Sequence, residues 1–156
     1  MRAAHSPVAY FVLYLFQHTN RLRVHFGETQ KAPYVTIGAK DGETSGKFYD
    51  AVFGAFGVER KFADGGWIGY GAKGSDKHDV FVCPPFDGKA AASGNGSMLA
   101  FKTNAKSEVE AAHKAGLANG GTDEGAPGFR PPEKESWYGA YLRDPTGNKI
   151  CLFAVG

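Results

Sequence analysis

Hydrophobic and polar positions in residues 33–156 follow two periods, close to two residues for strands and 3.6 residues for helices. In the first half they predict a strand over residues 34–38 and a helix over about residues 44–56. One side of this helix carries an apolar stripe of Phe48, Tyr49, Val52, Phe53 and Phe56. Gly57 is expected to end the helix, because glycine readily adopts the left-handed conformation of a C-terminal cap.

The second half repeats this plan. A strand is predicted over residues 98–102 and a helix over about residues 106–118, ended by Gly120 and Gly121. The apolar stripe of this helix contains Val109, Ala112, His113 and Leu117. Corresponding positions are separated by a nearly constant interval of about 60 residues, which indicates duplication of a unit of that length.

Short apolar runs after each helix predict the remaining strands. In the first unit these runs cover residues 58–62, 67–71 and 79–83. In the second unit they cover the weak stretch 120–128 and the runs 137–143 and 149–155. Each unit is therefore predicted to have the order βαβββ.

The last two strands are joined by Asp144, Pro145, Thr146, Gly147 and Asn148. Proline suits the second position of a tight turn, and glycine can take the positive φ that closes it. The aspartate side chain can accept hydrogen bonds from the turn backbone. This stretch is expected to form a tight hairpin.

Two βαβββ units with a strand, this turn and a final strand resemble the vicinal-oxygen-chelate superfamily, which includes glyoxalases, extradiol dioxygenases and antibiotic-resistance proteins. Gly94-Asn-Gly96 and the stretches 120–130 and 138–145 resemble its glyoxalase/bleomycin-resistance-like branch. The resemblance implies an α+β fold in which two curved sheets lie edge to edge around a cavity and helices cover the outside.

The resemblance covers residues 33–156, so we expect a domain over 32–156 with units at about 33–84 and 96–156. Residues 1–31 are expected to form an N-terminal extension that packs on the domain or on a partner subunit. Its apolar run, residues 8–16, is shorter than the roughly 20 residues that span a bilayer. No cleavage site typical of a signal peptide follows the run. Ser6 and Pro7 would suit a short helix, but the β-branched and aromatic content favours strands.

Composition places the chain among globular proteins, with 42% hydrophobic and 22% charged residues. Its 22 glycines favour a fold with many turns over a helical bundle. Residues 1–31 hold four basic residues and one acidic residue, and the remainder is close to neutral, which gives no electrostatic signature of a nucleic-acid partner. Cys83 and Cys151 form no disulfide framework, so we expect a reduced, cytoplasmic setting without membrane association.

In metal-dependent members of the superfamily, ligands come from the first and last strands of each unit. Matching the strands places Tyr34, Val82, Met98 and Cys151 at these four positions, where the family has His, Gln or Glu. Valine cannot bind a metal, and tyrosine and methionine are poor ligands for hard divalent ions. We therefore expect no metal and no other cofactor.

Other side chains suit a small-molecule pocket, because aromatic residues with polar tips bind flat or amphipathic ligands. Arg130 lies in a Gly/Pro-rich loop and is read either as an anchor for an anionic or carbonyl group or as the partner of Asp123, Glu124 or Glu133 in a salt bridge. The candidate ligand-binding residues are Tyr34, Trp67, Met98, Arg130, Tyr141 and Cys151.

No residue is assigned a catalytic role. His113 lies on the apolar stripe of its helix, which is typical of a core histidine, and His78 opens a strand and is expected to be exposed. Cys151 is expected inside the cavity, where a buried thiol has a raised pKa and is inert without a neighbouring base.

Two functions fit the resemblance. The first is a metal-independent small-molecule binding protein, a homodimer that holds its ligand in an aromatic cavity between the two units. The alternative is a metal-independent lyase- or isomerase-like enzyme that uses Tyr34, Tyr141, Arg130 or Cys151 for acid–base chemistry. A strongly shifted titratable group in the cavity would favour the enzyme, and aromatic walls without such a group would favour binding.

Overall fold

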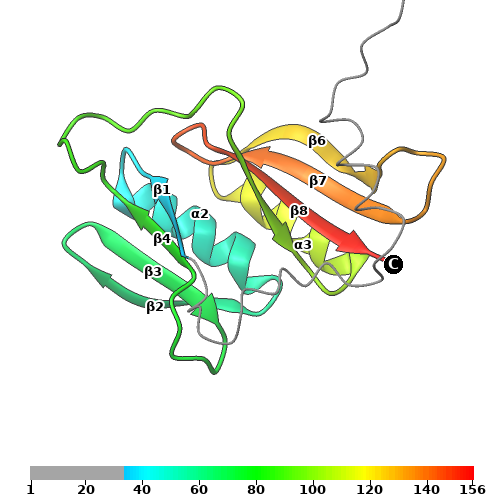
Figure 1. Cartoon of the computed structure of the whole chain (residues 1–156), viewed down its shortest axis with the longest axis horizontal. Coiled ribbons are helices and arrows are strands. Elements are labelled where there is room, and N and C mark those ends of the chain that lie inside the picture. The colour runs from blue at the N-terminus through cyan, green and yellow to red at the C-terminus, as the bar shows by residue number, and fades with distance from the viewer. Residues whose placement is uncertain (1–33) are drawn as a thin grey trace, which may run out of the picture. The chain divides into compact units, whose positions relative to one another are not determined.

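The computed structural model describes residues 34–156, which form two sheets and two helices (Figure 1). The strand interpretation of the N-terminal extension lies outside the described residues. In chain order the elements are β1 (Val35–Gly38), α2 (Gly42–Gly54), β2 (Val58–Asp64), β3 (Trp67–Ala72), β4 (Val80–Cys83), β5 (Met98–Lys102), α3 (Lys106–Ala118), β6 (Thr122–Phe129), β7 (Trp137–Arg143) and β8 (Lys149–Val155).

The two sheets have the same topology. Sheet A has the order β1-β4-β3-β2, and sheet B has the order β5-β8-β7-β6. In each sheet the first strand of the unit pairs in parallel with the last strand, and the other neighbours are antiparallel. The predicted α+β fold of two βαβββ units is confirmed. No helix of residues 34–156 is long and apolar enough to span a membrane.

Element boundaries follow local sequence signals. Helix α3 and strands β5, β7 and β8 have the predicted bounds, and the weak stretch becomes β6. Helix α2 begins two residues earlier than predicted, because Asp41 caps it by accepting a hydrogen bond from the Thr44 backbone N–H (2.6 Å).

One position predicted for the apolar stripe of α3 is wrong. Leu117 is 41% exposed, and Gly116 is buried instead. A Cβ atom at Gly116 would lie 3.1 Å from side-chain atoms of both Phe48 and Val52 on α2. The absence of a side chain on α3 at this point therefore lets the two helices pack closely.

Each helix covers one face of its own sheet, and we call the opposite face the open face. In sheet B the core contains Ile150, Leu152 and, packed at its edge, Leu99 and Phe101. Because strand side chains alternate between faces, Met98 and Cys151 lie on the open face. Leu99 and Leu152 therefore face the helices.

The turn between β7 and β8 is organised by the buried carboxylate of Asp144. Its Oδ1 accepts hydrogen bonds from the backbone N–H groups of Thr146, Gly147 and Asn148 at 2.8–2.9 Å. Its Oδ2 accepts one from the hydroxyl of Tyr49 on α2, at 2.8 Å. Burial, followed by the nearby Asp144 carboxylate, raises the pKa of Tyr49 well above its ordinary value.

The same turn also contacts the end of β1. The Asn148 side-chain amide donates to the Gly38 carbonyl at 2.8 Å, and the Lys40 backbone N–H donates to the Thr146 hydroxyl at 3.1 Å. We call this junction of the two units the seam. The turn that identifies the superfamily in the sequence is therefore a structural link between the units.

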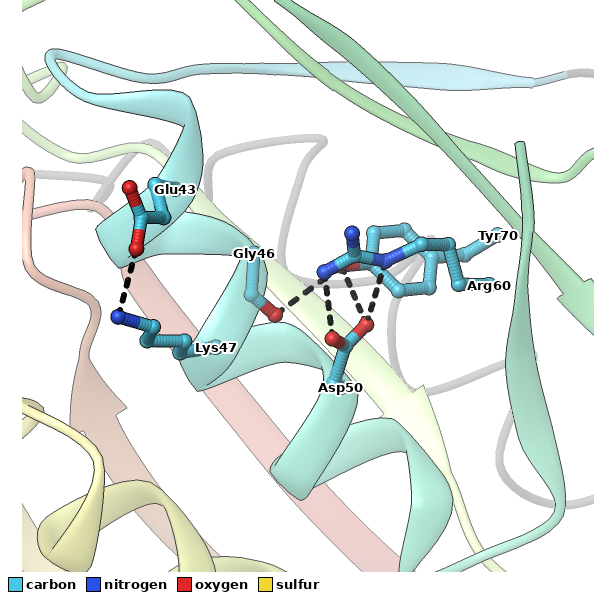
Figure 2. A network of polar contacts seen from close by, with 6 residues as sticks. All are labelled: Glu43, Gly46, Lys47, Asp50, Arg60 and Tyr70. Carbon is cyan, nitrogen blue, oxygen red and sulfur yellow. Dashed lines mark hydrogen bonds and ion pairs between the residues drawn. The ribbon is translucent and has the colours of Figure 1, made fainter. Parts of the chain in front are cut away.

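A polar network on the helix side of sheet A links α2, β2 and β3 (Figure 2). The Tyr70 hydroxyl donates to Asp50 Oδ1 (3.0 Å) and to the Gly46 carbonyl (3.3 Å), and Arg60 binds both Asp50 oxygens. Burial, with the Asp50 charge, raises the pKa of Tyr70. A Cβ at Gly46 would come within 2.8 Å of the Arg60 guanidinium, so glycine at this position makes room for the network.

Candidate functional site

The open face of sheet A carries a cluster of aromatic side chains centred on Phe81. Ring centres of the neighbours lie 5.2 Å (Tyr34), 6.0 Å (Phe62), 6.2 Å (Trp67) and 6.0 Å (His78) from that of Phe81. The Phe62 ring lies over Gly69, which has no side chain to displace it. Tyr34 remains 64% exposed and Trp67 42% exposed. Two predicted site residues, Tyr34 and Trp67, thus share one aromatic surface.

The predicted placement of Val82 is wrong. Strand β4 pairs Phe81 with Thr36 and Val82 with Ile37, and both Ile37 and Val82 are buried in the core beneath the helix. Val82 is 0% exposed. Since a slip of one residue exchanges the two faces of a strand, Phe81 occupies the open-face position expected for Val82.

The open face of sheet B brings together Met98, Tyr141 and Cys151. Tyr141 and Cys151 are register partners on β7 and β8, and Met98 lies on β5, next to β8. Cys151 is only 1% exposed, and this burial raises the pKa of its thiol to about 11. Its sulfur is therefore protonated and inert at neutral pH. Met98, at 45% exposure, is open to solvent.

A second aromatic group lies farther along the open face of sheet B. The Trp137 ring stacks on Phe153 with centres 5.5 Å apart, and the Tyr141 ring lies 6.3 Å from that of Trp137. The indole covers Gly139, where a side chain would collide with it. Sheet B thus repeats the arrangement of sheet A, with an aromatic ring laid over a glycine.

Arg130 forms no salt bridge with the acidic residues of the described chain. Its Nη1 donates to the Phe129 carbonyl and its Nη2 to the Ala126 carbonyl, both at 2.9 Å. The salt-bridge interpretation is wrong for Asp123 and Glu124, which bind other partners. Arg130 therefore holds its own loop together, and the guanidinium lies close to Gly128.

An ion network on the open face of sheet B was not expected from the sequence. Glu124 on β6 binds Arg143 on β7 and, at 2.9 Å, Lys149 on β8. The hydrogen bond from Arg143, and then that from Lys149, lower the pKa of Glu124. Lys149 Nζ also lies 5.3 Å from the ring centre of Tyr141, which joins the network to the aromatic surface.

The histidines lie in two different surroundings. His113 is buried on α3, and its Nε2 lies 2.8 Å from Asp123 Oδ1 on β6, so it is a core histidine as predicted. His78 is exposed, also as predicted, but its ring stacks on Phe81 on the open face of sheet A. Of the two, His78 is the one beside the candidate aromatic surface.

Two adjoining clefts lie at the seam. The seam cleft, of about 460 Å³, separates β1 from the starts of β5 and β8; its lining residues are Thr36, Ile37, Gly38, Gly94, Gly96, Ser97, Met98, Leu99, Asn148, Lys149 and Ile150. The loop cleft, of about 560 Å³, is lined by Ser93, Gly94, Asn95, Gly96, Ser97, Met98, Arg143 and Lys149.

Of the six predicted site residues, only Met98 lines these clefts, and neither lining contains an aromatic side chain. The aromatic residues gather on the open faces of the sheets. The sequence signal for the clefts is Gly94-Asn-Gly96, three residues separated from β5 by Ser97 alone.

Comparison with family models shows which family the chain belongs to. Residues 31–152 match the model of the Glyoxalase/Bleomycin resistance protein/Dioxygenase superfamily. The chain belongs to this superfamily. Comparison with curated proteins gives no match.

Solved structures of the superfamily are similar to this member. A glyoxalase/bleomycin resistance protein from Albidiferax ferrireducens T118 is 40% identical, with a TM-score of 0.71, and the match covers 80% of this chain and 98% of that one. A glyoxalase-related enzyme from Fulvimarina pelagi is 23% identical, with a TM-score of 0.62 and coverage of 80% and 88%. Lactoylglutathione lyase from Agrobacterium tumefaciens is 19% identical, with a TM-score of 0.56 and coverage of 82% and 96%, a likeness of fold.

The four family ligand positions of this superfamily member do not fit a hard divalent metal. They hold the phenol of Tyr34, the phenyl ring of Phe81, the thioether of Met98 and the thiol of Cys151, whose pKa is raised. Within residues 34–156 there is no group of three or more His, Cys, Asp or Glu side chains arranged to hold a metal ion.

Proposed function

We propose that this superfamily member is a metal-independent small-molecule binding protein whose ligand lies against the aromatic open faces of the two βαβββ units. The observation that carries the proposal is the pair of aromatic open faces. Tyr34 and Trp67 on sheet A, and Trp137 and Tyr141 on sheet B, present large rings with polar tips. Such rings suit a flat or amphipathic ligand, and exposed apolar patches mark binding surfaces.

The titratable groups favour binding over the lyase- or isomerase-like alternative. On the open faces, among the described residues, the pKa values of Cys151 and Cys83 rise because of burial, and this change makes a thiol less reactive. The strongly raised pKa values of Tyr49 and Tyr70 belong to groups on the helix sides of the sheets. These shifts therefore supply no acid or base for chemistry at the open faces.

We further propose that the protein is a homodimer in which a second copy covers part of the exposed aromatic surface. Two-fold symmetric dimers are the commonest oligomers. The exposed rings of Tyr34 and Trp67 supply apolar area that such a contact would bury.

Native mass spectrometry of protein purified without chelator tests these proposals together. The expected result is a dimer that carries a small organic molecule and no stoichiometric divalent metal. Replacement of Trp67 by alanine should reduce the bound molecule, whereas Phe86→Ala, which removes a fully exposed ring from the loop between the units, should not. About one Zn, Ni, Mn or Fe per chain, or conversion of the bound molecule, would contradict binding without metal.

A further inference from the structure

The lining of the loop cleft has an unbalanced charge. Arg143 and Lys149 are its two ionised side chains, and the other lining residues are small, uncharged or, in Met98, apolar. Glu124, which neutralises one of the two cations, is not among the lining residues. Two cations with one shared carboxylate leave one positive charge in excess beside the cleft.

The side chains of Arg143 and Lys149 are each held by hydrogen bonds, and both retain N–H donors without a partner among the described residues. Arg143 uses Nε for Glu124 and Nη1 for the Gly147 carbonyl at 2.8 Å, and its Nη2 has no partner within residues 34–156. Lys149 has a single ion-pair partner there, so the three-proton ammonium group retains donors. Their side chains are 37% and 32% exposed, open enough for a ligand to reach.

Another part of the lining of the loop cleft is a tight turn with backbone N–H groups that have no partner among the described residues. The Ser97 N–H bonds to the Gly94 carbonyl, and the N–H groups of Asn95 and Gly96 find no acceptor among the described residues. Gly96 has φ of 81°, a conformation that other residues rarely adopt. Small residues with unpaired backbone N–H groups form a wall that a ligand oxygen can approach closely.

The positive charge does not follow from the duplicated fold. Met98 pairs with Lys149 at the start of the parallel strands in sheet B. In sheet A the residue just before the paired Val80 is Asp79, whose carbonyl accepts a hydrogen bond from the Val35 N–H. The same place in the fold thus carries an acid in one unit and a base in the other.

We infer that the loop cleft binds the anionic group, a carboxylate or a phosphate, of a small aromatic acid, with Arg143 and Lys149 as its cationic donors. This inference rests on the proposed function, because the ring of the ligand lies on the aromatic open face of sheet B. The position of Lys149 Nζ, 5.3 Å from the Tyr141 ring centre, places the charge beside that surface. Charge-assisted hydrogen bonds from Arg and Lys are the usual means of holding such anions.

Titration calorimetry with four probes tests the inference: benzoate, phenyl phosphate, inorganic phosphate and the neutral benzamide. For the native protein, benzoate or phenyl phosphate should bind about tenfold more tightly than benzamide, as expected for a hydrogen bond to a charged group. Whichever of the two anions binds more tightly identifies the carboxylate or the phosphate as the natural group.

Matched variants assign the effect to the cleft. Lys149→Gln should remove the preference for the anion, Lys149→Arg should keep it, and Arg143→Gln should weaken it. Lys47→Gln is the control, because Lys47 forms an ion pair of similar length with Glu43 on α2 and does not line the cleft. Melting temperatures check that each variant is folded.

The two proposals fail in different ways. If benzoate and benzamide bind equally to the native protein and to Lys149→Gln, the aromatic surface binds ligands and the anion site is wrong. If inorganic phosphate binds in a Lys149-dependent manner while no aromatic probe adds affinity, the anion site stands and the proposed function is wrong. If no probe binds at millimolar concentration, or if Lys47→Gln causes the same loss, the anion site is wrong.

Discussion

The two units have the same strand order and helices of equal length. Their side chains nevertheless differ, both in the core beneath the helices and on the open faces of the sheets. The core of the first unit contains the rings of Phe48, Tyr49, Phe53 and Tyr70, whereas that of the second is built mainly from aliphatic side chains. On the open faces, sheet A carries a continuous aromatic cluster, and sheet B adds the ion network of Glu124, Arg143 and Lys149.

This difference separates the demands of folding from those of binding. Helix-facing positions need only apolar side chains of suitable volume, and rings or aliphatic groups both meet that need. Open-face positions are not constrained by the helices, so the second unit can place the cation of Lys149 where the first unit has Asp79. The asymmetry of the open faces, rather than the shared fold, therefore indicates where specificity lies.

The largest expected effect tests the assignment of the two faces. Val82→Glu places a carboxylate in the core beneath α2 and should lower the free energy of unfolding by more than about 4 kcal/mol. Phe81→Glu changes the open face and should cost only about 1–2 kcal/mol, from lost ring contacts. Urea denaturation measures both. Equal losses, or a greater loss for Phe81→Glu, would mean that the register of β4 is wrong.

A second test asks whether the two units can jointly rebuild a metal site. Cys151→Glu alone buries an unpaired carboxylate and should cost about 3 kcal/mol. The set Tyr34→His, Phe81→Glu, Met98→His and Cys151→Glu should bind Ni or Zn and recover part of that stability. The readout is the melting temperature with and without metal, with Cys151→Glu as the control. A set that ignores metal would show that these four positions do not converge.

The next largest loss of stability is expected from breaking the hydrogen bonds of Asp144 at the seam. Asp144→Ala removes the acceptor of three turn N–H groups and of the buried Tyr49 hydroxyl, and should cost about 2–3 kcal/mol. Asp87→Ala is the matched control, since Asp87 also accepts a backbone N–H, from Lys89, but in an exposed loop. Thermal unfolding of the two variants should differ clearly. Similar melting temperatures would mean that the turn does not stabilise the seam.

The smallest effect concerns the charges of sheet B. The folded-state pKa of Glu124 is lowered, so the stability contributed by its ionised form is present above its ordinary pKa and is lost as pH falls through the folded value. Stability measured between pH 6 and pH 3, values chosen to bracket roughly the ordinary glutamate range, should fall less steeply for Glu124→Gln than for the native protein. Glu43→Gln is the control, because the Glu43 side chain is exposed on α2. Parallel curves for Glu124→Gln and the native protein would contradict the network.

Most of the fold could be predicted because strong local periodicity determines each element. Turn residues lie close to the starts of β5 and β8 and fix their register, so the orientations of Met98 and Cys151 followed from the sequence. Strand β4 has only four residues, and three of them are buried. An apolar run of this kind has no alternation to set its register, and for this reason Val82 was placed on the wrong face.

Less of the candidate site could be predicted, because its contacts join distant segments. Glu124 lies in β6, the strand with the weakest sequence pattern, and its partners Arg143 and Lys149 flank a turn. The partners of Arg130 are backbone carbonyls, which side-chain chemistry does not reveal. The loop cleft forms where the turn before β5 lies beside the β7–β8 hairpin. A local sequence pattern cannot predict that these two distant segments are neighbours.

The hydrogen bonds of Asp144 and Asn148 should hold the two units together even when the chain between them is cut. They connect the β7–β8 hairpin to α2 and to the end of β1. The exposed loop around Phe86, which joins the two units, takes no part in these hydrogen bonds. A protease cut in that loop should therefore yield a nicked protein whose two fragments remain associated. Separately expressed fragments that carry the two units should reassemble when mixed, which would make the chain a natural candidate for a split reporter.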